Sequence, residues 1–269
     1  MNLIRAELLK LFTTSLWWIF AVVLLPLWGL ALGYNWLAAN VTLGVEGGVD
    51  GELAGFGSTE TVVSGLYTSG QSAGVLLVVL LGAIMVTGEF FHLTATSTFL
   101  TTPRRERVIV AKMIVAVGIA VSVWLITTAL NLAAAPLALT NLNQPSYLDE
   151  SFVWQAIGLN GVAFALWSLV GVGAGVLIRS QIGTVITLSV LYVIGTQVLT
   201  LVFFALSQYV WEPFMQLRVL VPTLASDLLI TGPQLDDDPP RWVGGLILFG
   251  YAAVTAVIGT LITKRRDIA

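Results

Sequence analysis

Long apolar runs alternate with shorter polar segments along the whole chain. At about 20 helical residues each, the runs are long enough to cross a hydrocarbon core roughly 30 Å thick. None of them carries a charged residue near its centre. The pattern predicts an all-α integral membrane protein with six transmembrane helices, over residues 16–33, 71–87, 113–137, 153–178, 182–206 and 242–262.

The composition supports a single transmembrane domain over residues 1–269. Hydrophobic residues make up 57% of the chain and charged residues only 10%, whereas soluble domains carry about 25% charged residues. The first apolar run is longer than the 7–15 residues typical of a signal peptide, so we expect it to be retained as a span. There is no cysteine, which excludes disulfides and thiolate chemistry.

Basic residues fall almost entirely on one predicted side of the membrane. With the N-terminus inside, ten of the twelve Lys and Arg residues lie on the cytoplasmic side, and only Arg218 and Arg241 lie outside. The acidic residues are distributed in the opposite way, with eleven of fifteen outside. Because Lys and Arg resist translocation, we expect both termini to be cytoplasmic.

Three outside loops follow from this topology, over residues 34–70, 138–152 and 207–241. The first is rich in glycine and the second is short and acidic. In the third, residues 209–230 are apolar, but Pro213, Pro222, Arg218 and Asp227 prevent a clean span. We therefore predict one or two short re-entrant helices that dip into the outer leaflet before the last span.

Residues 2–13 predict an amphipathic helix ahead of the first span. Ile4, Leu8 and Leu11 share one face with Phe12, and Glu7 and Lys10 lie opposite. Such a helix can rest in the membrane interface. The alternative is that it simply extends the first span into the cytosol.

Several kinds of chemistry are poorly supported. His92 is the only histidine, and neither an HExxH zinc motif nor a GxxxxGK[ST] phosphate loop is present. We predict no catalytic residue, no metal site and no nucleic-acid partner. The glycines of residues 171–175 lie inside an apolar span, where small residues allow close helix packing.

Neutral polar side chains occur within the spans. Asn131 and Asn160 are expected to hydrogen-bond across helices. The fifth span holds the largest group, and a pathway for an amphipathic compound needs such neutral polar groups. The candidate pathway-lining residues are Thr184, Thr187, Thr196, Gln197 and Thr200.

The cytoplasmic segment 88–112 has the most distinctive pattern. Aromatic and hydroxyl side chains alternate, Pro103 breaks any helix, and Arg104, Arg105 and Arg107 follow. A short amphipathic helix on the membrane surface, presenting arginines to a soluble partner, would explain this order. Alternatively, the arginines only enforce the topology.

This segment resembles the loop between spans two and three of type-2 ATP-binding-cassette (ABC) transporter permeases of prokaryotic exporters. It departs from their pattern at Leu93, where glycine is usual, and at Phe91, where a basic residue is common. The matching residues are Glu89, Phe90, His92, Thr94, Thr96, Leu100, Pro103, Arg104, Arg105, Arg107, Val108 and Lys112.

The resemblance implies the fold and the working of that family. Residues 88–112 would form the coupling loop that docks onto a separate ATPase subunit, which binds ATP and Mg²⁺. Two permease copies, either identical or related, would form the substrate pathway with spans one, two and five near the two-fold axis. We expect a multi-pass protein of the prokaryotic cytoplasmic membrane that exports a small amphipathic or hydrophobic compound and binds no cofactor itself.

Two other functions fit the sequence less well. A membrane scaffold or assembly factor with the same fold would recruit a partner through the basic loop without transport. An intramembrane enzyme would require Glu89 and His92 to be catalytic, but their place at the cytoplasmic end of span two favours docking or capping.

Overall fold

The computed structural model describes residues 2–43, 57–92, 105–234 and 237–265, and within these ranges the chain is helical, without β-strands. Six helical segments are long and apolar enough to cross a membrane, which confirms the predicted number. The helices are α1 (Asn2–Thr13), α2 (Leu16–Leu43), α3 (Thr59–Tyr67), α4 (Gln71–Phe91), α6 (Arg105–Thr140), α7 (Ser151–Ile178), α8 (Gln181–Val190), η2 (Leu191–Gly195), α9 (Thr196–Tyr209), η3 (Glu212–Leu220), α10 (Pro222–Thr231) and α11 (Arg241–Arg265).

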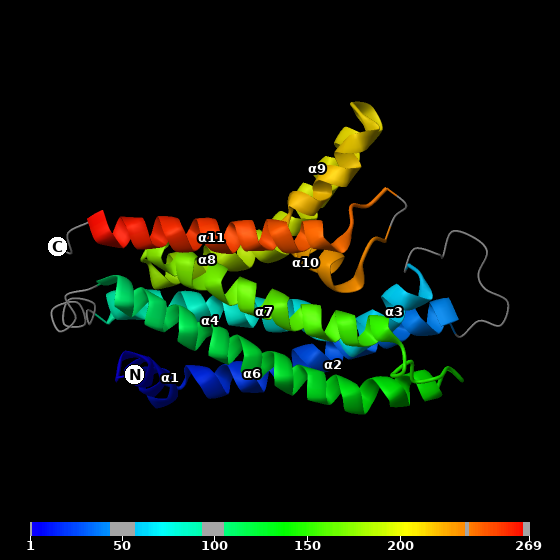
Figure 1. Cartoon of the computed structure of the whole chain (residues 1–269), viewed down its shortest axis with the longest axis horizontal. Coiled ribbons are helices and arrows are strands. Elements are labelled where there is room, and N and C mark those ends of the chain that lie inside the picture. The colour runs from blue at the N-terminus through cyan, green and yellow to red at the C-terminus, as the bar shows by residue number, and fades with distance from the viewer. Residues whose placement is uncertain (1, 44–56, 93–104, 235–236, 266–269) are drawn as a thin grey trace.

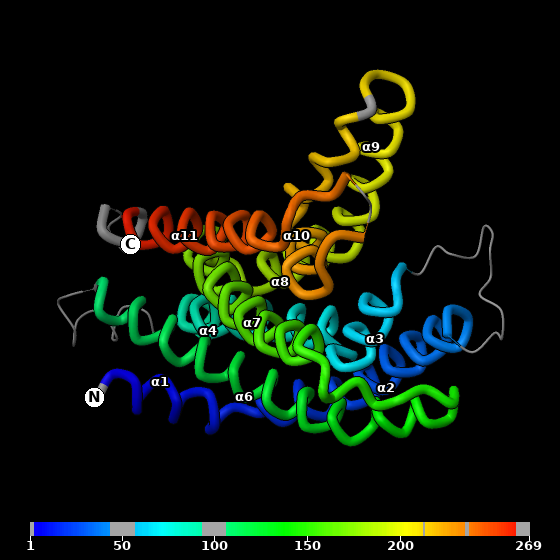
Figure 2. The backbone as a smooth tube through the Cα atoms, turned by 45° about the vertical axis from the view of Figure 1, so that its right-hand side comes forward, coloured from blue at the N-terminus to red at the C-terminus, as the bar shows by residue number. Residues whose placement is uncertain are grey.

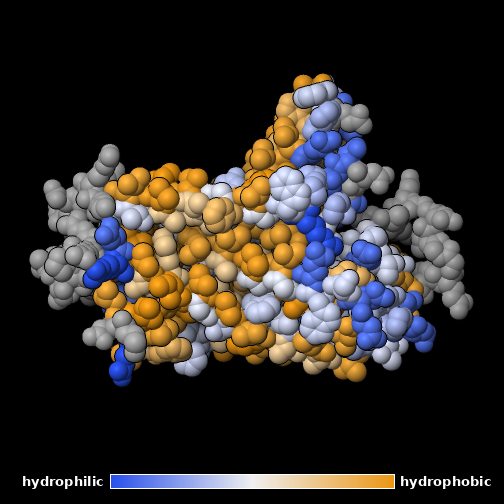
Figure 3. Space-filling model, in the orientation of Figure 1, coloured by the Kyte–Doolittle hydropathy of each residue, from blue (hydrophilic) through white to orange (hydrophobic). Residues whose placement is uncertain are grey.

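The long helices lie side by side along one direction, except that α9 leaves the bundle at an angle (Figure 1). The start of α1 and the end of α11 lie at the same end of the bundle in both views (Figures 1 and 2). Hydrophobic residues cover the middle of the face in Figure 3, and hydrophilic residues gather toward its ends. The assignment of the α1 end to the cytoplasm rests on the basic residues and stays a prediction.

Helix α7 lies at the centre of the packing, and its glycines allow close approach on two sides. A Cβ atom at Gly171 would overlap the Val79 carbonyl oxygen of α4, and one at Gly173 would lie 2.5 Å from Thr255 Cβ of α11. At Gly175 it would lie 2.7 Å from the Ala83 carbonyl oxygen. The predicted packing role of these glycines is confirmed.

Asn131 ties the α2, α3 and α6 region together. Its amide oxygen accepts a hydrogen bond from Trp28 Nε1 at 2.7 Å, and its Nδ2 donates to the Tyr67 and Ser69 carbonyl oxygens at 3.1 and 3.0 Å. The predicted cross-helix role of Asn131 is therefore confirmed. By contrast, Asn160 is buried and its Oδ1 has no hydrogen-bond partner within the described ranges.

Part of the segment predicted as the first outside loop is helical. Helix α2 continues through Leu43, and α3 forms a further short helix whose N-cap Ser58 accepts a weak 3.4 Å hydrogen bond from Thr61 N. The α3 side chains Val63, Leu66 and Tyr67 are buried against the bundle. This short helix was not predicted.

The apolar segment before the last span forms the two short helices η3 and α10, which meet at a bend of 96°. Arg218 Nη2 contacts both carboxylate oxygens of Asp238 at 2.9 and 2.8 Å, and Gln234 N donates to the same carboxylate at 2.9 Å. These bonds hold the turn that follows α10. The predicted pair of short helices is present, and its depth in a bilayer stays a prediction.

Candidate functional site

The described part of segment 88–112 consists of its two ends. Helix α4 carries Glu89 and Phe90 and ends at Phe91, with His92 as its C-cap, while α6 carries Arg107 and Lys112. Arg105 begins α6, and the position of its side chain is not described. The predicted coupling residues Thr94, Leu100, Pro103 and Arg104 lie outside the described residues.

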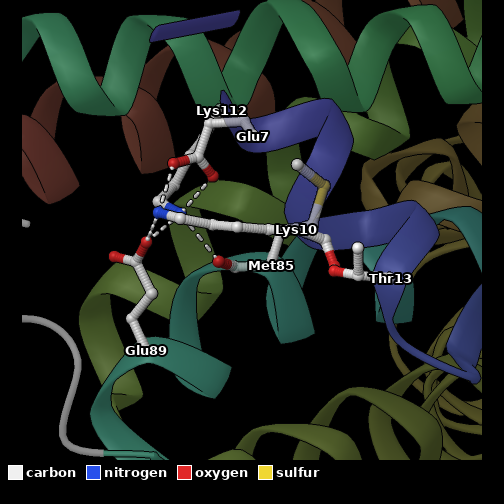
Figure 4. Close-up of polar contacts among 6 residues, drawn as sticks. All are labelled: Glu7, Lys10, Thr13, Met85, Glu89 and Lys112. Atoms are coloured by element: carbon white, nitrogen blue, oxygen red, sulfur yellow. Dashed lines mark hydrogen bonds and ion pairs between the residues drawn. The ribbon is translucent and has the colours of Figure 1, made fainter. Parts of the chain in front are cut away.

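The two ends of the segment meet in a cluster of four charged side chains, which we call the charge cluster: Glu7, Lys10, Glu89 and Lys112 (Figure 4). Lys112 Nζ lies 2.6 Å from Glu7 Oε2 and 3.0 Å from Glu89 Oε1. It also donates to the Met85 carbonyl oxygen at 2.9 Å. The cluster therefore joins α1, α4 and α6.

Lys10 completes the cluster on its exposed side. Its Nζ lies 2.8 Å from Glu7 Oε1 and 2.6 Å from Glu89 Oε1, so each carboxylate contacts both ammonium groups. Burial lowers the pKa of Lys10, but hydrogen bonds and charge attraction from Glu7 and Glu89 outweigh it and raise the pKa above its ordinary value. Lys10 thus stays protonated across the physiological range.

Three of the four side chains are almost completely buried, with exposed fractions of 4% for Glu7, 8% for Glu89 and 4% for Lys112. Lys10 is 45% exposed. Buried charges are costly unless they are paired and hydrogen-bonded. Two positive and two negative groups satisfy that condition, and removal of any one would leave an excess charge among the others.

The orientation of α1 differs from the prediction. Glu7 was expected on the face opposite the apolar side chains, yet it is buried at 3% exposure, while Leu8 and Phe12 are 37% and 59% exposed. Only Leu11 of the predicted apolar face is buried. The reason is that Glu89 and Lys112 present partners to the polar face, so α1 binds the bundle through ion pairs and directs apolar side chains outward.

A cavity of about 300 Å³ lies beside the charge cluster. Its wall comes from α1, the start of α2, α4 and the start of α8, and it includes all of the cluster except Lys112. The remainder of the wall is largely apolar, with Leu11, Leu81, Ile84 and Met85. The cavity could admit an apolar group next to Lys10.

Phe90 and His92 are not part of the charge cluster and contact other side chains. The Arg179 guanidinium, at the C-cap of α7, lies 5.4 Å from the centre of the Phe90 ring, within cation–π distance. The His92 ring meets the Phe91 ring edge to face with centroids 5.1 Å apart. The Arg179–Phe90 contact links the end of α4 to the end of α7.

The candidate pathway residues of the fifth span fall into three groups, which are buried, half-buried and exposed. Thr184 is fully buried, and its hydroxyl donates to the Ser180 carbonyl oxygen at 2.7 Å. Thr196 and Thr200 are half-buried, and Thr196 Oγ1 lies 2.8 Å from Thr223 Oγ1 of α10. Thr187 and Gln197 are exposed on the surface of the single chain. The structure does not bring the five together around one cavity.

Within the described ranges, no group of three or more His, Asp or Glu side chains could hold a metal ion. Glu89, which an intramembrane enzyme would require as a catalytic residue, forms ion pairs with Lys10 and Lys112. Sequence reasoning did not identify Glu7 and Lys10 as part of the site. One feature of the sequence could have indicated the cluster: Glu7, Lys10, Glu89 and Lys112 all lie near predicted cytoplasmic ends of helices.

No protein-family model matches the chain, and no curated protein matches it.

Proposed function

We propose that this chain is the permease subunit of an ATP-driven ABC exporter of the prokaryotic cytoplasmic membrane. Two copies form the substrate pathway, and two separate ATPase subunits supply ATP and Mg²⁺. The segment between α4 and α6 docks onto the ATPase. The exported compound is small and amphipathic or hydrophobic.

The charge cluster is the observation that most supports this proposal. A coupling loop must pass movement of the ATPase to the spans, and for that its two ends must be firmly attached to them. Glu89 and Lys112 flank the loop and form an ion pair with each other, and Lys112 also pairs with Glu7 of α1. A displacement of the loop is therefore transmitted to α1, α4 and α6 together.

The distribution of exposed surface supports the participation of a second copy. In the most apolar 18-residue stretch of α2 only 6% of the residues are buried. In the corresponding stretch of the fifth span none are buried. These are two of the spans that the resemblance places near a two-fold axis. An arrangement in which they meet their equivalents in a second copy would cover part of this surface.

The test is purification of the tagged full-length chain from its native membrane, followed by identification of bound subunits and reconstitution. We expect an ABC ATPase to co-purify and its hydrolysis in liposomes to be stimulated by the exported compound. The double substitution Arg104→Ala/Arg105→Ala should reduce the recovered ATPase at least tenfold. The matched control Lys264→Ala/Arg265→Ala also removes two predicted cytoplasmic charges and should have no effect.

The outcomes separate exporter from scaffold. A preparation that never carries an ATPase, together with unchanged transport in the Arg104/Arg105 variant, would overturn the proposal. A partner that binds through the same arginines but shows no solute-stimulated ATP hydrolysis would indicate a scaffold.

A further inference from the structure

A second cavity, of about 460 Å³, lies at the opposite end of the molecule from the charge cluster, among α2, α3, α4 and α10. Its volume is in the range of small-molecule sites. Unlike the cavity beside the cluster, its wall is rich in polar side chains. Asn35, Thr61, Thr68, Gln71, Ser72 and Thr231 all contribute to it.

Among the described residues that line this cavity, Asp227 of α10 is the one with a charged side chain. It is partly buried, and within the described residues no hydrogen bond or ion pair reaches its carboxylate. The two arginines on this side of the molecule have other partners. Arg218 pairs with Asp238, and Arg241 Nη2 donates to the Thr231 carbonyl oxygen at 3.3 Å. Neither arginine lines the cavity.

Two donors close to the cavity are already engaged elsewhere. Asn35 Nδ2 is engaged, since it donates to the Gly65 carbonyl oxygen and to Ser69 Oγ, both at 2.9 Å. No described donor reaches Asn35 Oδ1. The Tyr192 hydroxyl donates to the Ser72 carbonyl oxygen at 2.9 Å.

A carboxylate withdrawn from water and without a cationic partner is destabilised, and a ligand cation that reaches it restores the missing interaction. An anion would meet repulsion from the same group. Tyr34 lines the cavity with an aromatic ring that is 63% exposed, and such rings attract ammonium groups. Ser72 and Gln234 on its wall are also exposed, so the cavity is accessible from the surface.

We propose that this cavity is a binding site for the ammonium group of a cationic amphiphile, with Asp227 as its counter-ion. The apolar part of the ligand lies along the exposed surface of α2. The inference extends the exporter proposal by naming the charge class of a ligand. It concerns binding alone, so the two proposals can fail independently.

The experiment measures binding by native mass spectrometry to the full-length chain in a neutral maltoside detergent. The probe is dodecylammonium, and dodecanol is its uncharged counterpart. We expect the wild-type chain to bind dodecylammonium at least tenfold more tightly than dodecanol. Asp227→Asn should remove this preference and leave dodecanol binding unchanged.

Asp237→Asn is the matched control, because it removes an exposed acidic side chain from the same side of the molecule that does not line the cavity. It should retain the preference. Should Asp227→Asn fail to fold, Ala31→Phe provides a second variant that fills the cavity from α2 and should weaken dodecylammonium binding. Equal binding of the two probes by the wild-type chain, or an unchanged preference in Asp227→Asn, would overturn the proposal.

A competition arm distinguishes two sources of the ammonium group. Phosphatidylethanolamine or phosphatidylglycerol is added to wild-type protein already shown to bind dodecylammonium in an Asp227-dependent manner. Displacement by phosphatidylethanolamine alone supports the site as one for a lipid headgroup. Displacement by neither lipid supports it as one for a soluble amphiphile. If phosphatidylglycerol displaces dodecylammonium as well as phosphatidylethanolamine does, the site does not recognise the ammonium group and the proposal is contradicted.

Discussion

At the scale of single residues, the most informative feature is the charge cluster, in which three charges are buried and a fourth, on Lys10, is half-exposed. Such ion pairs add little net stability compared with a well-packed apolar core, yet breaking one is costly because a buried charge is left unpaired. The charge cluster therefore acts mainly to specify the position of α1. Apolar contacts alone would not do so, since Leu11 is buried but Leu8, Leu9 and Phe12 are exposed.

Replacement of Lys112 by methionine should destabilise the fold strongly. The side chain is 4% exposed and pairs with both carboxylates, so its loss leaves two buried negative charges. We expect a loss of roughly 3–5 kcal/mol in the free energy of unfolding, measured by thermal or denaturant unfolding in detergent. Lys10→Met also removes one positive charge, but from a side chain that is 45% exposed. Water can take the place of its ammonium group, so the loss in the free energy of unfolding should be about 1 kcal/mol or less.

A double substitution tests whether the pairing itself is responsible. In Lys112→Met the carboxylates of Glu7 and Glu89 share Lys10 as their counter-ion. Adding Glu7→Gln removes the excess negative charge, so the double variant should be more stable than Lys112→Met alone. If instead the loss of stability in the double variant equals the sum of the losses in Lys112→Met and Glu7→Gln measured separately, Lys112 acts through packing.

Sequence reasoning succeeded for Asn131 and failed for Glu7, and the difference is physical. A polar side chain in the middle of an apolar run has no water to bind, so a partner on another helix could be inferred without knowing which helix. Glu7 lies where water is near, so an exposed position was equally available to it. Glu7 is buried because the fold brings Lys112 close to it, and the local sequence around Glu7 does not show that the two residues are close.

At the scale of helices, the contact of α7 with α4 and α11 depends on small residues. Helices in a bilayer gain little from hydrophobic exclusion, because lipid is as apolar as the side chains, and they associate through close packing instead. The glycines of α7 bring backbone atoms of α4 and α11 within van der Waals contact.

Gly171→Val should therefore disrupt the bundle, since even a Cβ atom there overlaps the α4 backbone, which cannot yield as a flexible side chain can. Overpacking typically costs about 1–3 kcal/mol, and we expect a fall in the melting temperature and in the monodisperse fraction on gel filtration. Gly158→Val places the same side chain on the same helix, where nothing lies within 4 Å of the added Cβ. A comparable loss in both variants would show that helix propensity is responsible.

The six spans could be predicted because the length of an apolar run is a local property that the bilayer thickness fixes. Helix α3 could not, because its nine residues are too few for a span and lie in a segment whose glycines favour a loop. Its burial comes from partners distant in sequence: Tyr67 O accepts from Asn131, and Ser69 Oγ accepts from Asn35. The extension of α2 to Leu43 similarly follows from packing against α3 rather than from hydropathy.

At the scale of the whole molecule, burial is uneven among the spans. Within the most apolar windows, 67% of the α4 residues and 56% of the α7 residues are buried, against 6% for α2 and none for the fifth span. The fifth span also contains the π-helical turn η2, and beyond it α9 diverges from the other helices (Figure 1). A single copy thus has a packed core on one side and two spans with few contacts.

Cross-linking through introduced cysteines tests whether a second copy covers these two spans, and the absence of native cysteine makes the background clean. Leu30 of α2 is 72% exposed and Leu201 of α9 is 66% exposed. Near a two-fold axis a residue approaches its own equivalent, so Leu30→Cys or Leu201→Cys should give a covalent dimer with a short bifunctional maleimide in native membranes. Leu137→Cys on α6 is the control at 69% exposure, and it should stay monomeric because the proposed interface between copies involves α2 and the fifth span and leaves α6 outside it. A dimer through Leu137 alone would place the interface on α6 and contradict the proposed pathway, since the exposed polar side chains of the fifth span, Thr187 and Gln197, would then not meet a second copy.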